Sequence, residues 1–262
     1  MGIVNVTPDS FSDGGMFRDT AAAVAHGLRL LEEGADILDV GGESTRPGSD
    51  PVGPDEERSR VLPVVEGLRR EAPEALLSVD TRRAAVAEAA VSSGADIVND
   101  VTAGIDREMF RVVAAAGAGL VLMHMQGEPK TMQVDPRYDD VVGEVRAFLR
   151  ERLEAAVAAG IGRDRLAVDP GIGFGKNLQH NLDLLHSIGS FRELGVPVLA
   201  GVSRKRFIGE LSGVDDPAGR LEGSVAAAVW CATQGVDVVR VHDVGPTVRA
   251  LRVAEAIARG RP

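Results

Sequence analysis

Four polar residues of three chemical kinds lie at or near the ends of short apolar runs in this sequence: Asp80, Asn99, Asp169 and Lys205. The two carboxylates accept hydrogen bonds, and the amide both accepts and donates them. Brought together, these groups suit a flat heterocycle that carries several N–H donors. Because buried charges without partners are costly, a bound ligand or the lysine must satisfy the carboxylates. We therefore expect a pocket for a nitrogen heterocycle.

A second, cationic set consists of Thr45, Arg46, Arg240 and His242. The forked guanidinium of arginine matches the oxygens of a phosphate or a diphosphate. The chain of 262 residues carries a formal net charge of -10, so a local cluster of cations is more informative here than in a basic protein. The same acidity argues against general affinity for nucleic acid or for an anionic membrane surface.

Eight apolar runs, each followed by a helical pattern, carry these residues. The expected strands span Gly2–Val6, Ile37–Val40, Leu76–Asp80, Ile97–Val101, Gly119–Met125, Leu166–Asp169, Val198–Val202 and Val238–Val241. The expected helices lie near 19–33, 55–71, 82–92, 106–116, 139–158, 177–188, 217–234 and 246–258. A spacing of about 33 residues per unit is typical of a (β/α)₈ barrel, and continuous apolar runs fit parallel strands that are buried on both faces. We expect one domain over residues 1–262, with an N-terminal segment missing upstream.

Three segments repeat one pattern within this arrangement. They are GADILDV from Gly34, GADIVND from Gly94 and GVDVVRV from Gly235. In each, a glycine ends a helical pattern, an acid follows, and an apolar run begins. The pattern predicts a helix C-cap that leads directly into a buried strand.

The polar residues lie at the carboxyl ends of the expected strands, where barrel enzymes place their chemistry. Each also has a local interpretation. Asp80 with Thr81, and separately Asp100, have the residue types that cap a following helix. The SRKR segment from Ser203 is also typical of a solvated turn, and His124 is typical of a core histidine with a satisfied ring. Capping explains one residue per loop, whereas a binding site explains all of them at one barrel mouth.

The segment NVTPDSFSDGG, residues 5–15, places the large apolar Phe11 inside a polar loop. We expect residues 7–15 to form a mobile lid, because its glycines lower the cost of bending. Asn5 would be the fixed end of this lid. Phe11 would be buried only in the working complex, and the alternative is a phenylalanine that packs permanently on the barrel.

Other functional motifs fail on inspection. The GIGFGK segment from Gly171 lacks the spacing of a phosphate-binding loop and has Asn177 where a magnesium-binding hydroxyl is required. The segment around Ser203 is not a nucleophile elbow, and the histidines show no zinc spacing. The single cysteine, Cys231, excludes a disulfide within the chain and fits a reduced compartment, so we expect a cytoplasmic protein.

Eight motifs together resemble one family. They are MGIVNVTPDSFSDGG, DVGGESTRPG, SVDT, IVND, LMHMQGEPKTMQ, DPGIGFGK, SRKRFIG and RVHDV. They follow one another from Met1 to about Val244, one per strand end, and are similar to the motifs of the dihydropteroate synthases, the folate-pathway enzymes that sulfonamides inhibit. The resemblance implies a (β/α)₈ barrel and a homodimer. It also implies a reaction that joins 4-aminobenzoate to (7,8-dihydropterin-6-yl)methyl diphosphate, with loss of diphosphate and with Mg²⁺ as cofactor.

The resemblance assigns roles residue by residue. It implies a pterin site formed by Asp80, Asn99, Asp169 and Lys205. It implies a diphosphate and Mg²⁺ site formed by Asn5 as metal ligand, Thr45, Arg240 and His242. It implies a 4-aminobenzoate pocket formed by Phe11, Arg46, Pro47, Phe174 and Ser203 of the SRK loop. The catalytic residues would be Asp80, Lys205, Arg240 and His242. Many members carry a small residue after the loop lysine, where this chain has Arg206.

The chemistry of the reaction indicates which step the enzyme must accelerate. The arylamine of aminobenzoate is neutral at pH 7, so it requires no general base, whereas diphosphate is hard to expel. Mg²⁺ and the cations would stabilise the charge that grows on the leaving group. The pterin ring can carry positive charge at its exocyclic carbon, which favours a dissociative substitution. Two alternatives stay open: a methyltetrahydrofolate–corrinoid methyltransferase, and a paralogue that binds pterin without catalysis.

Overall fold

The strands form a parallel barrel in the computed structural model, which describes residues 1–6, 15–43, 52–128 and 130–261. The strands are β1 Gly2–Asn5, β2 Ile37–Gly41, β3 Leu76–Asp80, β4 Ile97–Asp100, β5 Gly119–Met123, β6 Leu166–Asp169, β7 Leu199–Gly201 and β8 Val238–Arg240. Strands β1 to β6 pair in chain order, and β7 pairs with β8. Backbone bonds close the ring: Ile3 N–H donates to Val241 O at 3.0 Å, and Val168 N–H donates to Pro197 O at 2.9 Å.

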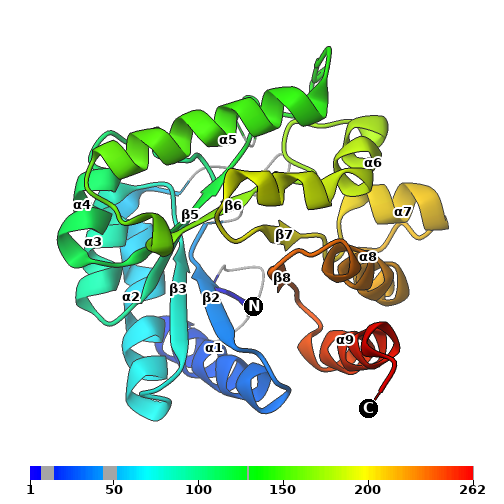
Figure 1. Cartoon of the computed structure of the whole chain (residues 1–262). Helices are drawn as coiled ribbons and strands as arrows, with labels where there is room; N and C mark the ends of the chain where they lie inside the picture. The colour runs from blue at the N-terminus through cyan, green and yellow to red at the C-terminus, as the bar shows by residue number, and fades with distance from the viewer. Residues whose placement is uncertain (7–14, 44–51, 129, 262) are drawn as a thin grey trace.

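Helices surround this barrel on the outside (Figure 1). They are α1 Gly15–Glu32, α2 Pro54–Glu71, α3 Ala84–Ser92, α4 Met109–Ala116, α5 Val141–Ala158, α6 Leu178–His186, α7 Arg206–Ser212, α8 Leu221–Thr233 and α9 Val244–Arg259. Short 3₁₀ turns lie at Arg163–Arg165, Ile188–Leu194 and Pro217–Gly219. None of the helices in the described segments combines the length and apolar character that a membrane span requires.

Acidic residues at the starts of two strands fix the register of their neighbours. Asp96, just before β4, accepts a 2.8 Å hydrogen bond from Leu77 N–H of β3. Asp237, just before β8, accepts a 2.8 Å bond from Val198 N–H beside β7. For two of the three repeated segments this explains the acid before the strand, because an N–H group at a strand start otherwise lacks a partner.

The barrel interior changes from apolar to polar along its axis. Met1, Val121 and Leu199 form a buried apolar cluster, with Ile37, Ile97, Ala167 and Val238 packed against it. Side chains alternate along a strand, so residues two positions further along point to the same interior. Five of those positions are Asp39, Asn99, Asp169, Gly201 and Arg240, and the other two are the apolar Ile3 and Met123. The polar groups therefore collect toward the carboxyl ends of the strands.

The predicted (β/α)₈ barrel is confirmed, and the differences lie in element boundaries. Strand β5 ends at Met123 rather than Met125, and α1 begins at Gly15 rather than near residue 19. A short helix, α7, precedes the helix that was predicted over residues 217–234, and the latter begins at Leu221 after a 3₁₀ turn. Helix α7 is too short to show a helical period, and the residue that caps its C-terminus, Gly213, has a left-handed conformation.

Candidate active site

Arg240 of β8 bridges two carboxylates inside the barrel. Its Nε atom donates to Asp39 Oδ2 at 2.6 Å, and its Nη2 atom donates to Asp80 Oδ2 at 2.8 Å. Asn99 Nδ2 donates to the same Asp39 oxygen at 3.1 Å. Asp39 is fully buried, and its Oδ1 atom has no hydrogen-bond partner among the described residues. Strands β2, β3, β4 and β8 thus bring three of the predicted site residues into one polar network.

Burial sets the charges of this network. Burial raises the pKa of Asp80 to about 7; Arg240 opposes that rise, and Asp39 adds to it. Burial alone would lower the pKa of Arg240, but the two carboxylates reverse the direction and raise it. The guanidinium therefore stays charged, whereas Asp80 changes charge near neutral pH.

Lys205 and Asp169 form the opposite side of the mouth. A side chain built on Gly201 would begin 3.8 Å from Lys205 Nζ and 4.0 Å from Asp169 Oδ2, so glycine leaves both groups accessible to a ligand. Burial lowers the pKa of Lys205 to about 8, against the effect of Asp169. Burial raises the pKa of Asp169, against the effect of Lys205. Lys205 Nζ also lies 4.4 Å from the centroid of the Phe174 ring, an attractive cation–π distance.

The ends of β7 and β8 are fastened to each other. The Ser203 hydroxyl lies 3.0 Å from His242 Nδ1 and accepts the His242 N–H at 3.2 Å. Arg204, which has a φ of 58° in the left-handed region, forms a bidentate pair with Asp243 at 3.0 and 2.6 Å. These contacts hold the SRK loop against the predicted diphosphate residue His242.

The structure shows which of the polar residues at the strand ends form hydrogen bonds within their own loop and which do not. Asp80 does not cap α3, because Ala84 N–H of its first turn donates to Asp106 instead, at 2.8 Å. Asp100 does serve its own loop, since it accepts bonds from Thr102 N–H at 2.8 Å and Gly104 N–H at 2.7 Å.

The other two local interpretations, for the SRKR segment and for His124, have opposite outcomes. Within the SRKR segment, Ser203 is buried and Lys205 Nζ donates to Ile172 O, so these residues do not form a solvated turn, whereas Arg206 is exposed. His124 is a buried histidine whose Nδ1 lies 3.0 Å from Lys176 Nζ, so the interpretation as a satisfied core histidine is confirmed. Asn177 is the N-cap of α6, where its side chain accepts the His180 N–H.

Several predicted site residues lie outside the described part of the chain. They are Phe11, Thr45, Arg46 and Pro47. Most of the expected lid, residues 7–14, lies outside it as well. Asn5 is described: a side chain built on Gly41 would begin 3.9 Å from Asn5 Oδ1 and 3.8 Å from Asp80 Oδ2, so both oxygens border the same space. Among the described residues no cluster of three or more His, Cys, Asp or Glu side chains has metal-binding geometry.

Sequence reasoning did not assign a role to Asp39 or Lys176. A signal existed for Asp39, because it interrupts the apolar run ILDV of a strand buried on both faces, and such a charge requires a partner. For Lys176 the sequence holds no comparable signal, because a lysine next to a glycine-rich loop is usually exposed.

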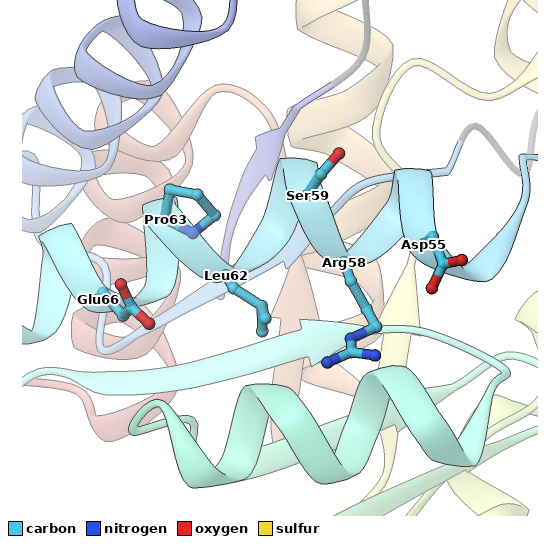
Figure 2. Close-up of a pocket in the computed structure, with 6 residues that line it drawn as sticks. All are labelled: Asp55, Arg58, Ser59, Leu62, Pro63 and Glu66. Atoms are coloured by element: carbon cyan, nitrogen blue, oxygen red, sulfur yellow. The ribbon is translucent and has the colours of Figure 1, made fainter.

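A hollow of approximately 320 Å³ lies along the surface of α2 (Figure 2). Its lining side chains all come from α2: Asp55, Arg58, Ser59, Leu62, Pro63 and Glu66. None of the predicted site residues lines it, and its carboxylates and arginine are ordinary features of a solvated helix face.

The chain resembles known proteins over nearly its whole length. The family of pterin binding enzymes matches residues 1–242. A dihydropteroate synthase of Neisseria meningitidis serogroup C is 51% identical over 261 residues, which cover 98% of this chain and 92% of that protein. The structure of Xanthomonas albilineans dihydropteroate synthase with 4-aminobenzoic acid matches with a TM-score of 0.93 and 53% identity, covering 98% of this chain and 92% of that one. The same enzyme in complex with 7,8-dihydropteroate matches with a TM-score of 0.90 and 51% identity, at 98% and 92% coverage. The chain therefore belongs to the pterin binding enzyme family and, within it, to the dihydropteroate synthases.

Proposed function

We propose that this protein joins (7,8-dihydropterin-6-yl)methyl diphosphate to 4-aminobenzoate and releases diphosphate, forming 7,8-dihydropteroate. The observation that carries the proposal is the convergence of hydrogen-bond acceptors and cations at one barrel mouth, where Arg240 links Asp80 to the buried Asp39. The similarity to synthases solved with 4-aminobenzoic acid and with 7,8-dihydropteroate supports the same two ligands here.

The pterin ring would occupy the polar interior. Its N–H donors require acceptors, which Asp80, Asn99 and Asp169 supply from three strands. Lys205 supplies a donor for a ring carbonyl or ring nitrogen. Hydrogen bonds from the pterin would also offset the desolvation cost of the buried carboxylates, because an unpaired buried charge is unfavourable.

The cations would act on the leaving diphosphate. Arg240 is charged and held in place by two carboxylates, so it requires no rearrangement as negative charge develops on the departing oxygen. His242, whose ring is held by Ser203, would face the same group. Thr45 and Arg46 complete this proposed set from outside the described residues. Asp80 would stabilise the positive charge that the pterin carries when the bond to diphosphate lengthens.

A magnesium ion fits this arrangement through the diphosphate. Mg²⁺ is commonly held by one or two protein oxygens together with substrate phosphates and water. Asn5 Oδ1, which borders the space above Gly41 beside Asp80, is an oxygen of that kind. We propose Asn5 as the protein ligand. When bound, Mg²⁺ would neutralise charge on the diphosphate.

The aminobenzoate would lie next to the pterin methylene group, between the SRK loop and Phe174. Phe174 is half-buried and would form one wall, with Ser203 beside it, and Phe11, Arg46 and Pro47 are proposed for the remainder. Because the arylamine is a neutral nucleophile, the site has only to orient it toward the pterin carbon. Arg206 would not intrude, because its side chain is 77% exposed and pairs with Glu210 on α7.

We also propose that the protein is a cytoplasmic homodimer. Support for the dimer comes from exposed apolar side chains on the last three helices, since exposed apolar surface favours association. These residues are Leu211 on α7, Trp230 on α8, and Val253 and Ile257 on α9. Support for the compartment comes from the buried, free thiol of Cys231.

Release of diphosphate tests the proposed reaction. Purified protein should release diphosphate from the pterin substrate with Mg²⁺ at a rate that depends on aminobenzoate, and omission of either organic substrate should stop the release. A corrinoid methyltransferase would instead consume methyltetrahydrofolate in the presence of a corrinoid protein. A paralogue without catalysis would bind the pterin and release nothing.

A further inference from the structure

The loop between β6 and α6 is held by an unusual number of side-chain donors. Four consecutive carbonyls of this loop each accept a hydrogen bond from a different side chain. The pairs are Ile172 O with Lys205 Nζ, Gly173 O with Gln133 Nε2 at 2.6 Å, Phe174 O with Lys176 Nζ at 2.9 Å, and Gly175 O with Tyr138 Oη at 2.9 Å. Side chains from several parts of the chain therefore fix the position of this loop.

Lys176 is the least ordinary of these donors. It is 2% exposed, and no carboxylate of the described residues lies within ion-pair distance of its ammonium. Its Nζ atom contacts Phe174 O at 2.9 Å and His124 Nδ1 at 3.0 Å. Burial, with a smaller contribution from Lys205, lowers its pKa to about 7 although Asp169 opposes the change. A buried amine without a paired carboxylate destabilises the fold, so its contacts with the loop require a functional explanation.

His124 is a rigid anchor for this amine. Its backbone N–H donates to Asp169 O at 3.0 Å, and its ring packs edge-on against Phe148 at a centroid distance of 4.9 Å. Burial, and then the neighbouring Lys176, lowers the pKa of His124 to about 3. The ring is therefore neutral, and its Nδ1 atom can accept the hydrogen bond from the ammonium.

Two glycines bring the loop into direct contact with the backbone that follows β5. A side chain on Gly171 would begin 1.8 Å from His124 O, and one on Gly175 would begin 2.3 Å from Gln126 O. Both glycines have positive φ, at 70° and 63°, which side chains rarely adopt. Within this tight contact, the Lys176 side chain reaches from the loop to His124, the residue that follows β5.

The same loop carries the Phe174 ring, against which Lys205 Nζ lies at 4.4 Å. Lys205 binds the carbonyl of residue 172 and Lys176 binds the carbonyl of residue 174, so the two lysines fix the backbone two residues apart. A shift of the Phe174 carbonyl would move the ring relative to Lys205.

We propose that Lys176 is a positioning residue for the aminobenzoate side of the site: it links the Phe174 carbonyl to His124 and so fixes the Phe174 ring. This inference rests on the proposed function. Lys176 touches neither substrate in it, and acts only through Phe174.

The first test is kinetic and uses Lys176→Met, which keeps the unbranched shape and removes the donors. The KM for 4-aminobenzoate should rise about tenfold, equivalent to about 1.4 kcal/mol, while kcat at saturation and the KM for the pterin substrate change by less than about threefold. His124→Phe, which removes the acceptor and keeps the aromatic packing, should do the same. His124→Asn, which restores an acceptor, should return the KM toward the wild-type value.

The matched control is Asn177→Ala, the adjacent residue and the N-cap of α6. It should lower the melting temperature and leave the KM for aminobenzoate unchanged. The proposal is overturned if Lys176→Met and His124→Phe both keep the wild-type KM, or if Asn177→Ala raises it as much as they do. If the loss in free energy for the double variant, calculated from the KM for aminobenzoate, equals the sum of the losses for Lys176→Met and His124→Phe, the two residues do not act as a linked pair.

Hydrogen exchange separates this inference from the reaction itself. The amides of residues 171–175 should exchange faster in Lys176→Met than in the wild type or in Asn177→Ala. If the wild type forms no product, the proposed function is wrong, while unchanged exchange in Lys176→Met overturns the positioning role independently. Faster exchange together with an unchanged affinity for aminobenzoate, measured by calorimetry, would also overturn it.

Discussion

Replacement of Asp80 by asparagine tests the pterin assignment. The substitution keeps the shape of the side chain and removes its charge. Arg240 would keep its 2.6 Å bond to Asp39 and could still donate to the amide oxygen at residue 80, so the barrel should remain folded. The substitution also removes the repulsion between the carboxylates of Asp80 and the buried Asp39, which in the wild type contributes to the raised pKa of Asp80.

The expected loss of pterin affinity follows from the bond that disappears. Hydrogen bonds to a charged group contribute about 1.5–3 kcal/mol, so the affinity for pterin diphosphate should fall roughly 10- to 150-fold. The amide also presents two donors toward the N–H groups of the ring, which places the result near the upper end of this interval.

The pH dependence supplies an internal check. Burial raises the pKa of Asp80 to about 7, and only its ionised form is a pure acceptor. Pterin affinity of the wild type should therefore decrease as the pH falls through 7. The affinity of Asp80→Asn should be lower throughout and should lack this transition.

Isothermal titration calorimetry with the pterin diphosphate and Mg²⁺, from pH 6 to pH 8, gives both results. The control is Ser78→Ala on the same strand, because the buried Ser78 hydroxyl has no hydrogen-bond partner among the described residues. It should bind like the wild type. A folded Asp80→Asn variant that binds the pterin with wild-type affinity would refute the assignment of Asp80.

Further predictions concern the metal, the loop and the folding stability. Asn5→Ala should raise the Mg²⁺ concentration needed for half-maximal rate, and excess chelator should stop diphosphate release reversibly; full activity in chelator would contradict the proposed metal. Gly171→Ala should lower the melting temperature and the activity together, because its methyl group would meet His124 O; an unchanged thermal scan would contradict the packing. Burial lowers the pKa values of Lys176 and Lys205 to about 7 and about 8. The native state then binds fewer protons than the unfolded state, so the contribution of these two groups to the free energy of unfolding should rise with pH between about 7 and 10. Denaturant titrations of the wild type and Lys176→Met should show a smaller rise in the variant, and an identical slope would contradict the burial of this charge.

The sequence predicts the barrel well because its signals are local and repeated. Each strand is an apolar run of the right length, and the glycine and acid before β4 and β8 mark strand starts whose acids bind the neighbouring strand. The position of polar groups after each run then places them at one mouth by the geometry of the fold. Helix α7 was missed because a short helix gives no periodic signal.

The side-chain network could not be predicted, because it joins residues that are far apart in the chain. Arg240 contacts Asp39 across 201 positions, and Lys176 contacts His124 across 52. Periodicity predicts that a residue points inward, but it does not say which inward groups meet. The prediction treated Arg240 as a group for the diphosphate alone, whereas the structure shows that two carboxylates also hold it.

Product formation tests the central claim most directly. Wild-type protein and Asp169→Asn should be incubated with the pterin diphosphate, isotopically labelled 4-aminobenzoate and Mg²⁺, and the products identified by mass spectrometry. We expect the wild type to form labelled 7,8-dihydropteroate, and Asp169→Asn, folded by circular dichroism, to lose most of that activity. No labelled product from the wild type, or an equal yield from the variant, would contradict the proposal that this barrel mouth binds the pterin and carries out the condensation.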